Sequence, residues 1–381
     1  MSGVLIRVQG LPGNLCDHTL GDSQVSTLNG VSVTKTKEVS IDGRRGEGGG
    51  QILRTSLTLS ALLKVPVKID HIRGNRKKPG LRPQHLTAVN ALATITGARV
   101  DGARVDSTEL LFEPEGVKAG NYRFHIGTAG STGLVFQTLI PVLLFGNTSS
   151  RVHITGGTHV PWSPPFHYLN SVFSPALKAM GGEVHLEIPK WGWYPKGGGV
   201  VRASVYPTQG IKAIQYIHRG KLMDIHVLSA TSNLPIHIAE RQRDQALRRL
   251  EYLGIMPHTQ IENAPSPGQG TALFLAARFE GITAGFTSLG KRGKRAEAVA
   301  DDACDELIAF LDGGRVLDRH LADQLVLYMA LAEGYSTFLA DKVTEHLLTN
   351  IWVIEQFLPV AFEAEEEAGK IGVQGSGFTL A

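Results

Sequence analysis

A glycine-rich turn that runs directly into a helix constrains this chain more than any other stretch. Residues 46–54 read Gly-Glu-Gly-Gly-Gly-Gln-Ile-Leu-Arg, and apolar residues then recur at helical spacing to about Leu63. Glycines before a helix let a ligand approach the backbone, and the free N–H groups and positive dipole end favour phosphate. Gln51 and Arg54 lie one turn apart, so a guanidinium is available to a polyphosphate. The stretch therefore predicts a phosphate site; the plain alternative is a turn into a core helix with a solvated Arg54.

The carboxylate in this turn, Glu47, does not attract an anion. Its presence is explained if a divalent cation lies between Glu47 and the phosphates. The spacing is not that of a P-loop, because no Lys-Ser or Lys-Thr pair follows the last glycine. The residues that complete the dinucleotide-binding fingerprint are missing as well.

Length and composition indicate an ordinary soluble globular protein and leave the charge of its partner open. The 381 residues predict two or three domains, and 42% hydrophobic and 19% charged residues are typical of globular chains. A net charge of +3 permits an anionic partner, but any basic site must be local. Cys16 and Cys304 lack metal-ligand spacing and predict a reducing cytosol. We expect no membrane contact and no secretory signal.

The order strand, helix, strand, strand recurs along the chain, each time with a glycine-rich turn. The repeat length of roughly 70 to 80 residues predicts repeated α/β units. The expected fold class is therefore α/β (α+β in detail), with a large domain of repeated βαβαββ-like units over residues 37–214 and 315–381. A smaller α/β domain is expected as an insertion at residues 215–314, and residues 1–36 as a loose extension.

Two runs of basic residues are separate from the glycine turn. Residues 73–82 contain five cations, which indicates either a clamp for a phosphate backbone or a solvated loop. A helix should follow, with Pro83 at its start and Gly97 at its end, so that Gln84 and His85 lie beside the basic loop. The second run, residues 291–295, is predicted to be solvated.

His346 is the histidine whose position suggests chemistry. It falls in the first turn of a helix predicted to begin at the N-cap Thr344, where the dipole favours an uncharged imidazole. An uncharged imidazole is what a nitrogen nucleophile needs. A lone histidine is more often a core or capping residue. Asp323 and Gln324 begin another helix, as orienting groups, ligand-binding groups or partners of the helix dipole.

Five segments together resemble the RNA 3′-terminal phosphate cyclase family. They are residues 46–54, 73–81, 84–89, 321–325 and 346–350, and the resemblance runs from about residue 37 to about residue 362. It implies that ATP and a divalent metal, Mg²⁺ or Mn²⁺, are used to convert an RNA 3′-phosphate to a 2′,3′-cyclic phosphodiester. The implied intermediates are a histidine–AMP adduct and an RNA adenylate.

The resemblance also implies roles for individual residues. His346 takes the nucleophile's position and Glu47 that of the metal-binding carboxylate. ATP contacts are implied for Gln51, Arg54, Gln137, Pro164, His320, Leu321, Ala322, Asp323 and Gln324, and RNA phosphate contacts for Arg73, Arg76, Gln84 and His85. Members of the family usually carry tyrosine where this chain has His320, and an imidazole stacks on adenine more weakly.

The segment from His346 to Asn350 resembles the bacterial and archaeal branch, which favours a cytoplasmic location. Two other classes stay open. Non-catalytic relatives act as ribosome-biogenesis factors that bind RNA, although His346, Glu47 and Arg54 argue against that reading. Enolpyruvyl transferases share the repeated architecture and bind phosphate with basic residues, without a histidine adenylate.

Overall fold

The computed structural model describes residues 6–7, 25–28, 31–34 and 38–380 of the chain. Most of the extension expected over residues 1–36 lies outside these residues. The described parts of it are β1 (Ile6–Arg7), which pairs with β18, and the hairpin of β2 (Val25–Leu28) and β3 (Val31–Thr34). Within the described residues no helix is long and apolar enough to cross a membrane.

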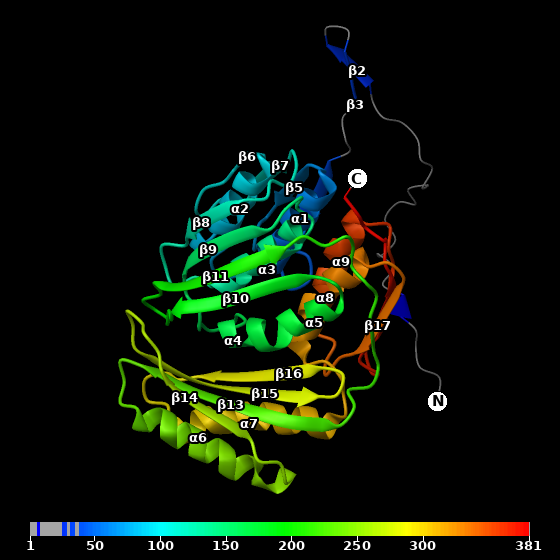
Figure 1. The fold of residues 1–381 in the computed structure, drawn as a ribbon. Helices are drawn as coiled ribbons and strands as arrows, with labels where there is room; N and C mark the ends of the chain where they lie inside the picture. Colours follow the sequence, from blue (N-terminus) through cyan, green and yellow to red (C-terminus); the bar gives the residue numbers. More distant parts are fainter. Residues whose placement is uncertain (1–5, 8–24, 29–30, 35–37, 381) are drawn as a thin grey trace.

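The predicted repeat of α/β units is confirmed, and three units share one topology (Figure 1). The first comprises β4 (Val39–Asp42), α1 (Gly50–Leu63), β5 (Val67–Asp70), α2 (Pro83–Thr96), β6 (Arg99–Asp101) and β7 (Leu110–Glu113). The second comprises β8 (Asn121–His125), α3 (Thr132–Leu144), β9 (Ser150–Gly156), α4 (Phe166–Tyr168), a π-helical turn (Leu169–Phe173), α5 (Ser174–Ala179), β10 (Glu183–Lys190) and β11 (Gly199–Tyr206). The third comprises β12 (Gln215–Tyr216), α8 (Arg319–Leu331), β17 (Tyr335–Leu339), α9 (Glu345–Phe357), β18 (Phe362–Glu365) and β19 (Lys370–Gln374).

Strand order shows the repeat most clearly. The sheets read β4-β5-β7-β6, β8-β9-β11-β10 and β12-β17-β19-β18, so the fourth strand of each unit lies between its second and third. The first two strands of each unit are parallel, and the later ones are antiparallel to their neighbours. The three units are therefore equivalent in topology.

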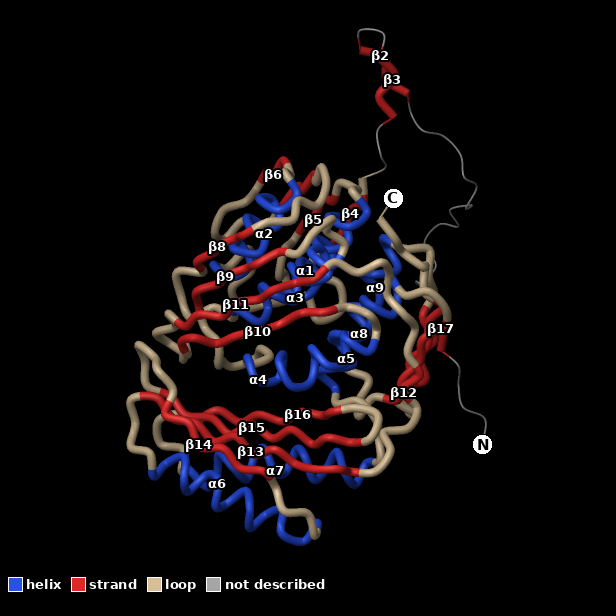
Figure 2. Tube along the Cα trace, in the orientation of Figure 1, coloured by secondary structure: helices blue, strands red, loops and turns tan. Residues whose placement is uncertain are grey.

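A further α/β segment interrupts the third unit after its first strand. It comprises β13 (Leu222–Ser232), α6 (His237–Leu250), β14 (His258–Asn263), β15 (Gly270–Phe279), β16 (Thr283–Leu289) and α7 (Ala296–Gly313), with strand order β14-β13-β15-β16. In Figure 2, α6 and α7 cover one face of this sheet and α4 lies on its other side. Gln215 pairs with Thr337, so β12 lies in the sheet of the third unit. The division into a large and an inserted domain stays a prediction.

Local sequence explains where the helices of the site begin. Pro83 opens α2, and Gly97 ends it at φ +67°, in the left-handed region that favours glycine. Thr344 caps α9 by accepting the N–H of Leu347 at 3.0 Å. The start of α1 at Gly49 has no side-chain cap, so its first N–H groups remain available to a ligand.

Helices of all three units pack on one another in the core (Figure 1). α1 lies against α3 and α9, and α8 lies against α9. Leu57, Leu139, Leu325 and Ile351 are fully buried there. Because helices of different units cover parts of one another's apolar faces, the helix starts are brought to one region. The chain is helical without a break from Phe166 to Ala179, and Leu169–Phe173 within it has π-helical hydrogen bonding.

Candidate active site

One large cavity gathers the segments that the sequence singled out. Its volume is about 1530 Å³. Its walls are the starts of α1, α2, α8 and α9, the loops before α3 and α4, and the end of β16. Ligand pockets usually span about 300 to 1,000 Å³. The cavity therefore has room for more than one substrate.

The glycine turn packs directly against the helix that carries His346. Gly46 and Gly48 have φ of +52° and +57°. The N–H of Glu47 donates to Thr349 Oγ1 at 3.3 Å, and Thr349 lies one turn after His346 on α9. A Cβ atom on Gly46 would overlap that hydroxyl. Two segments 302 positions apart in the sequence thus meet at this turn.

A chain of buried hydrogen bonds fixes α1, α9 and α8 relative to one another. Thr55 Oγ1 donates to Asn350 Oδ1 at 2.7 Å, and Asn350 Nδ2 donates to the backbone oxygen of Asp323 at 2.9 Å. Asn350 is buried, so loss of either bond would leave an unpaired amide group. No role was predicted for Thr55 or Asn350, although both lie in or beside the family-like segments.

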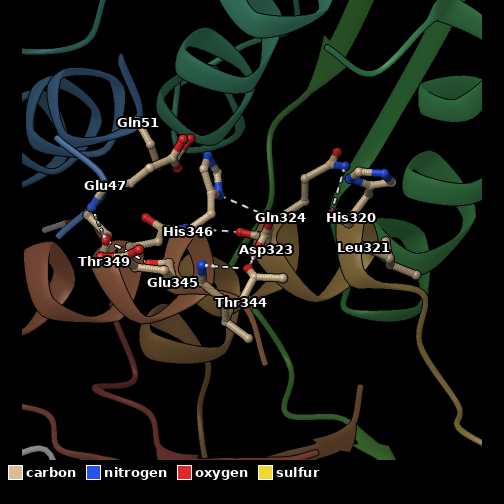
Figure 3. Close-up of polar contacts among 12 residues, drawn as sticks. Glu47, Gln51, His320, Leu321, Asp323, Gln324, Thr344, Glu345, His346 and Thr349 are labelled. Carbon is tan, nitrogen blue, oxygen red and sulfur yellow. Dashed lines mark hydrogen bonds and ion pairs between the residues drawn. The ribbon is translucent and has the colours of Figure 1, made fainter. Parts of the chain in front are cut away.

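The His346 imidazole faces a carboxylate. Its Nδ1 lies 3.0 Å from Asp323 Oδ2, at ion-pair distance but without the geometry of a hydrogen bond, and Thr344 Oγ1 donates to Asp323 Oδ1 at 3.3 Å. Figure 3 shows Asp323 and Thr344 on one side of the ring and Gln51 and Glu47 on the other. A carboxylate at Nδ1 favours the tautomer with its proton there, which leaves a lone pair on Nε2. The side chain is 34% exposed, so a ligand in the cavity can reach it.

Arg54 supplies a buried positive charge beside the glycine turn. It is 8% exposed, and burial lowers its pKa to about 10, while the Glu47 carboxylate acts in the opposite sense. It therefore stays cationic at neutral pH. Its guanidinium donates to Gln51 Oε1, but the buried Nε has no partner among the residues described. A buried donor without a partner is costly, and an anion bound there would remove the cost.

Two arginines of the basic loop have contacts within the protein. Arg76 forms an ion pair with Glu47. Arg73 donates to the backbone oxygens of Lys78 and Gly80 at 2.8 and 3.0 Å. Its pKa is lowered by burial and by the nearby charges of Arg82 and Arg76. Arg73 thus shapes the loop as well as lining the cavity.

Gln84 and His85 hold the start of α2 beside the other walls. Gln84 Oε1 accepts the N–H of Ser131 at 2.9 Å, and His85 Nδ1 accepts the N–H of Arg82 at 3.2 Å. Burial, then Arg54 and other arginines, lower the pKa of His85 to about 3. The imidazole is therefore neutral, and its Nε2–H is near Gly50.

Most residues assigned to ATP line the cavity, and two do not. Gln51, Arg54, Gln137, Pro164, His320, Asp323 and Gln324 line it. Gln324 Nε2 donates to the backbone oxygen of His320 at 3.0 Å, and its Oε1 is buried without a partner among the described residues. Leu321 and Ala322 are fully buried and are not in the wall. Neighbours on a helix point to different sides, and these two face the core.

The interrupting segment contributes residues that were not expected at the site. Lys291 and Lys294 line the cavity, and Lys294 Nζ donates to Ser288 Oγ at 2.9 Å and pairs with Asp302. The run 291–295 was predicted to be solvated. That holds for Lys291, Arg292 and Arg295, which are exposed, but not for Lys294.

Asp318 anchors α8 in a way that was not predicted. It is buried, its Oδ1 accepts the Tyr168 hydroxyl at 2.6 Å, and its Oδ2 accepts the N–H of Gly285 at 3.3 Å. Asp318 also caps α8 by accepting the N–H groups of His320 and Leu321. Burial raises its pKa. These contacts join α4 and β16 to the helix that carries Asp323.

Comparison with known proteins identifies the family of this chain. Residues 45–364 match the family model for RNA 3′-terminal phosphate cyclase, and the chain belongs to that family. A protein named RNA 3′-terminal phosphate cyclase from Pyrobaculum neutrophilum is 44% identical over 89% of this chain and 99% of its own length. Proteins of the same name from Staphylothermus marinus and Methylococcus capsulatus are 47% and 44% identical, over 90% and 83% of this chain and 99% and 90% of their own. An enolpyruvyl transferase, NikO from Streptomyces tendae, is similar in structure over 45% of this chain and 33% of that one, at 15% identity and a TM-score of 0.25.

Proposed function

We propose that this protein is an ATP-dependent RNA 3′-terminal phosphate cyclase that works through an adenylate on His346. The main support for the proposal is that the groups needed for nucleotidyl transfer share one cavity. The imidazole faced by Asp323 opens on the same cavity as the uncapped start of α1 and the buried Arg54. Relatives at 42–47% identity that bear the cyclase name support it.

In the first step the Nε2 lone pair of His346 attacks the α-phosphorus of ATP. A P–N bond forms, the bond to the bridging oxygen breaks, and pyrophosphate leaves. Asp323 stabilises the positive charge that the ring acquires. The N–H groups at the start of α1, together with Arg54, stabilise the phosphate charges.

In the second step an oxygen of the RNA 3′-phosphate attacks the phosphorus of the adenylate. The P–N bond breaks and the neutral imidazole is restored. In the third step the ribose 2′-oxygen attacks the activated 3′-phosphorus, AMP leaves, and the hydroxyl proton is released to the medium. Arg73 and Arg76 lie in the cavity wall and would hold the RNA phosphate, and the cavity volume admits a nucleotide and an RNA end together.

A divalent ion, Mg²⁺ or Mn²⁺, belongs to the proposal. Among the described residues no group of three or more His, Cys, Asp or Glu side chains is placed to hold a metal. Mg²⁺ usually takes one or two protein carboxylates, with phosphate oxygens and water for the rest, so Glu47 alone fits that role. Glu47 would have to release Arg76, which would then be free for a phosphate. Bound there, the ion would neutralise charge on the triphosphate.

Mass spectrometry after incubation with ATP and Mg²⁺ or Mn²⁺ tests the proposal. We expect one AMP adduct that maps to His346 and is absent from His346→Ala. His237→Ala, which changes an exposed histidine outside the cavity, should keep the adduct. If the wild-type protein formed no adduct, it would instead be a binding factor like the family's non-catalytic relatives. A cytoplasmic location stays a prediction.

A further inference from the structure

The outer face of the sheet β8-β9-β11-β10 concentrates positive charge. We call it the basic sheet face, and it consists of Arg123, His125, Arg151, His153, His185, Lys190 and Arg202. Strand alternation turns Tyr122 and Phe124 toward the core, which places Arg123 and His125 outward. Arg123 is beside His153 and His153 beside Arg202, so one row crosses three strands. Figure 2 shows the four strands side by side.

Two glutamates on the same face, Glu183 and Glu187, offset part of this charge. Arg202 lies 3.8 Å from Glu187, and His185 lies 2.9 Å from Glu183. Within the part of the chain that the structure describes, no carboxylate lies within 4 Å of the Arg123 or Arg151 guanidinium. The whole protein carries only +3, so three arginines and a lysine against two glutamates on one face are still a local excess.

The positive charge around His153, at the centre of the row, contributes to lowering the pKa of that histidine. The pKa of His153 is lowered first by its partial burial, then by Arg202 and Arg123. Neighbouring arginines within one row repel one another, and that cost falls when a polyanion binds. The basic sheet face is therefore suited to binding the phosphates of a polyanion.

The basic sheet face begins at the rim of the cavity. β8 leads into the loop whose Ala129 and Ser131 line the cavity, and β10 ends at Lys190, four residues before the cavity-lining Tyr194. Tyr194 is 68% exposed. In the neighbouring loop the cavity-lining Trp162 is 96% exposed, at φ +57°. A chain leaving the cavity here would pass two exposed aromatic rings and then reach the cations.

We propose that the RNA upstream of its 3′ end lies on the basic sheet face and is held there through its phosphates. The proposal rests on the cyclase function, which places the 3′ end in the cavity. Arginine and lysine contacts to phosphate are independent of sequence, so the face would add affinity without selecting bases. The rows from His125 to Arg151 span about 13 Å along the strands, at about 3.3 Å per residue. An RNA of only two nucleotides would occupy the cavity without reaching most of the face.

The test compares two RNAs that both end in a 3′-phosphate, a dinucleotide and a single strand of about 16 nucleotides, the upper end of common single-strand site sizes. In the Arg123→Glu/Arg151→Glu variant we expect at least tenfold weaker binding of the long RNA. The slope of log K against log salt should fall by about 1.4, since each single-strand phosphate contact contributes about 0.7. Dinucleotide cyclisation and adenylate formation should be unchanged. Lys221→Glu/Arg248→Glu makes the same change in net charge on exposed residues elsewhere and should bind long RNA normally.

Unchanged affinity and salt slope for the long RNA would overturn the proposal, and so would an equal loss in the control pair. If the Arg123→Glu/Arg151→Glu variant also lost adenylation, the neutral Arg123→Gln/Arg151→Gln variant replaces it in the test. The same decrease in the slope of log K against log salt is expected for that variant. A wild-type protein that formed no adenylate would refute the cyclase function. In that case the comparison of long-RNA and dinucleotide binding would still show whether the basic sheet face binds RNA.

Discussion

Replacement of Asp323 by Asn separates two roles that the sequence left open for this residue. The carboxylate faces His346 Nδ1 at 3.0 Å. If Asp323 stabilises the ring as the P–N bond forms, its loss slows adenylation itself. If it only binds ATP, its loss raises the ATP concentration needed and leaves the saturated rate alone.

The size of the effect follows from the distance and the exposure. Opposite unit charges separated by the observed 3.0 Å attract by about 5 kcal/mol at an effective dielectric constant of about 20. His346 is 34% exposed, so screening reduces this to roughly 1.5 to 3 kcal/mol, the range expected once the charged ring turns Nδ1–H onto the carboxylate as a hydrogen bond. Since about 1.4 kcal/mol is a factor of ten in rate, Asp323→Asn should slow adenylation about 10- to 100-fold.

Single-turnover labelling with α-labelled ATP over a range of concentrations gives the saturated rate and the half-saturating concentration separately. Glu345→Gln is the control, because it removes a carboxylate from the same helix start that has no ion pair with His346 among the residues described. It should leave the saturated rate near the wild-type value. A wild-type saturated rate in Asp323→Asn would refute the orienting role.

Three further outcomes are expected. Gly46→Ala should destabilise the protein by about 1 to 3 kcal/mol and suppress adenylation, because φ at Gly46 is +52° and the new Cβ would overlap Thr349. The control Gly254→Ala, at φ +65° in open space, should lose stability only. Equal adenylation by the two variants would contradict this prediction. Glu47→Ala should need several times more Mg²⁺ for adenylation, and an unchanged metal optimum would remove Glu47 from the metal site. Burial lowers the pKa of His85 to about 3 and that of His167 to about 4, so the unfolded chain binds more protons below about pH 6.5. Urea unfolding should therefore show stability falling from pH 6.5 to 5 by up to about 1.4 kcal/mol per pH unit for each histidine, and a flat profile there would contradict the assigned burial.

Local signals predicted the starts of α2 and α9 and the end of α2. They did not predict the start of α8, because Asp323 and Gln324 were placed at the helix start and α8 begins at Arg319, capped by Asp318. Pro83, Gly97 and Thr344 act through contacts a few residues away, so their positions follow from the sequence. The repeat was also visible, because glycine turns and strand patterns recur at a regular distance. The sequence did not predict that β12 lies in the sheet of the third unit. A strand of two residues is too short to show a periodic pattern, and its place becomes visible only through its pairing with Thr337.

Long-range contacts account for what the sequence did not predict in the site. Asp318 joins Tyr168 and Gly285, and nothing near Asp318 in the chain indicates either partner. Lys294 lies in a basic run of ordinary appearance, and only packing of the interrupting segment brings it to the cavity. Leu321 and Ala322 were assigned as part of a segment, although side-chain direction on α8 separates them from their neighbours.

The contact between Glu47 and Thr349 spans 302 positions of sequence. At a synthesis rate of about 5 to 20 residues per second, the glycine turn leaves the ribosome roughly 15 to 60 seconds before its partner helix. Throughout that interval α1 exposes the apolar surface that α9 will later cover. A nascent chain or a truncated product that stops short of residue 345 lacks both the nucleophile and this cover. Adenylation would therefore report only on chains that have been translated past α9.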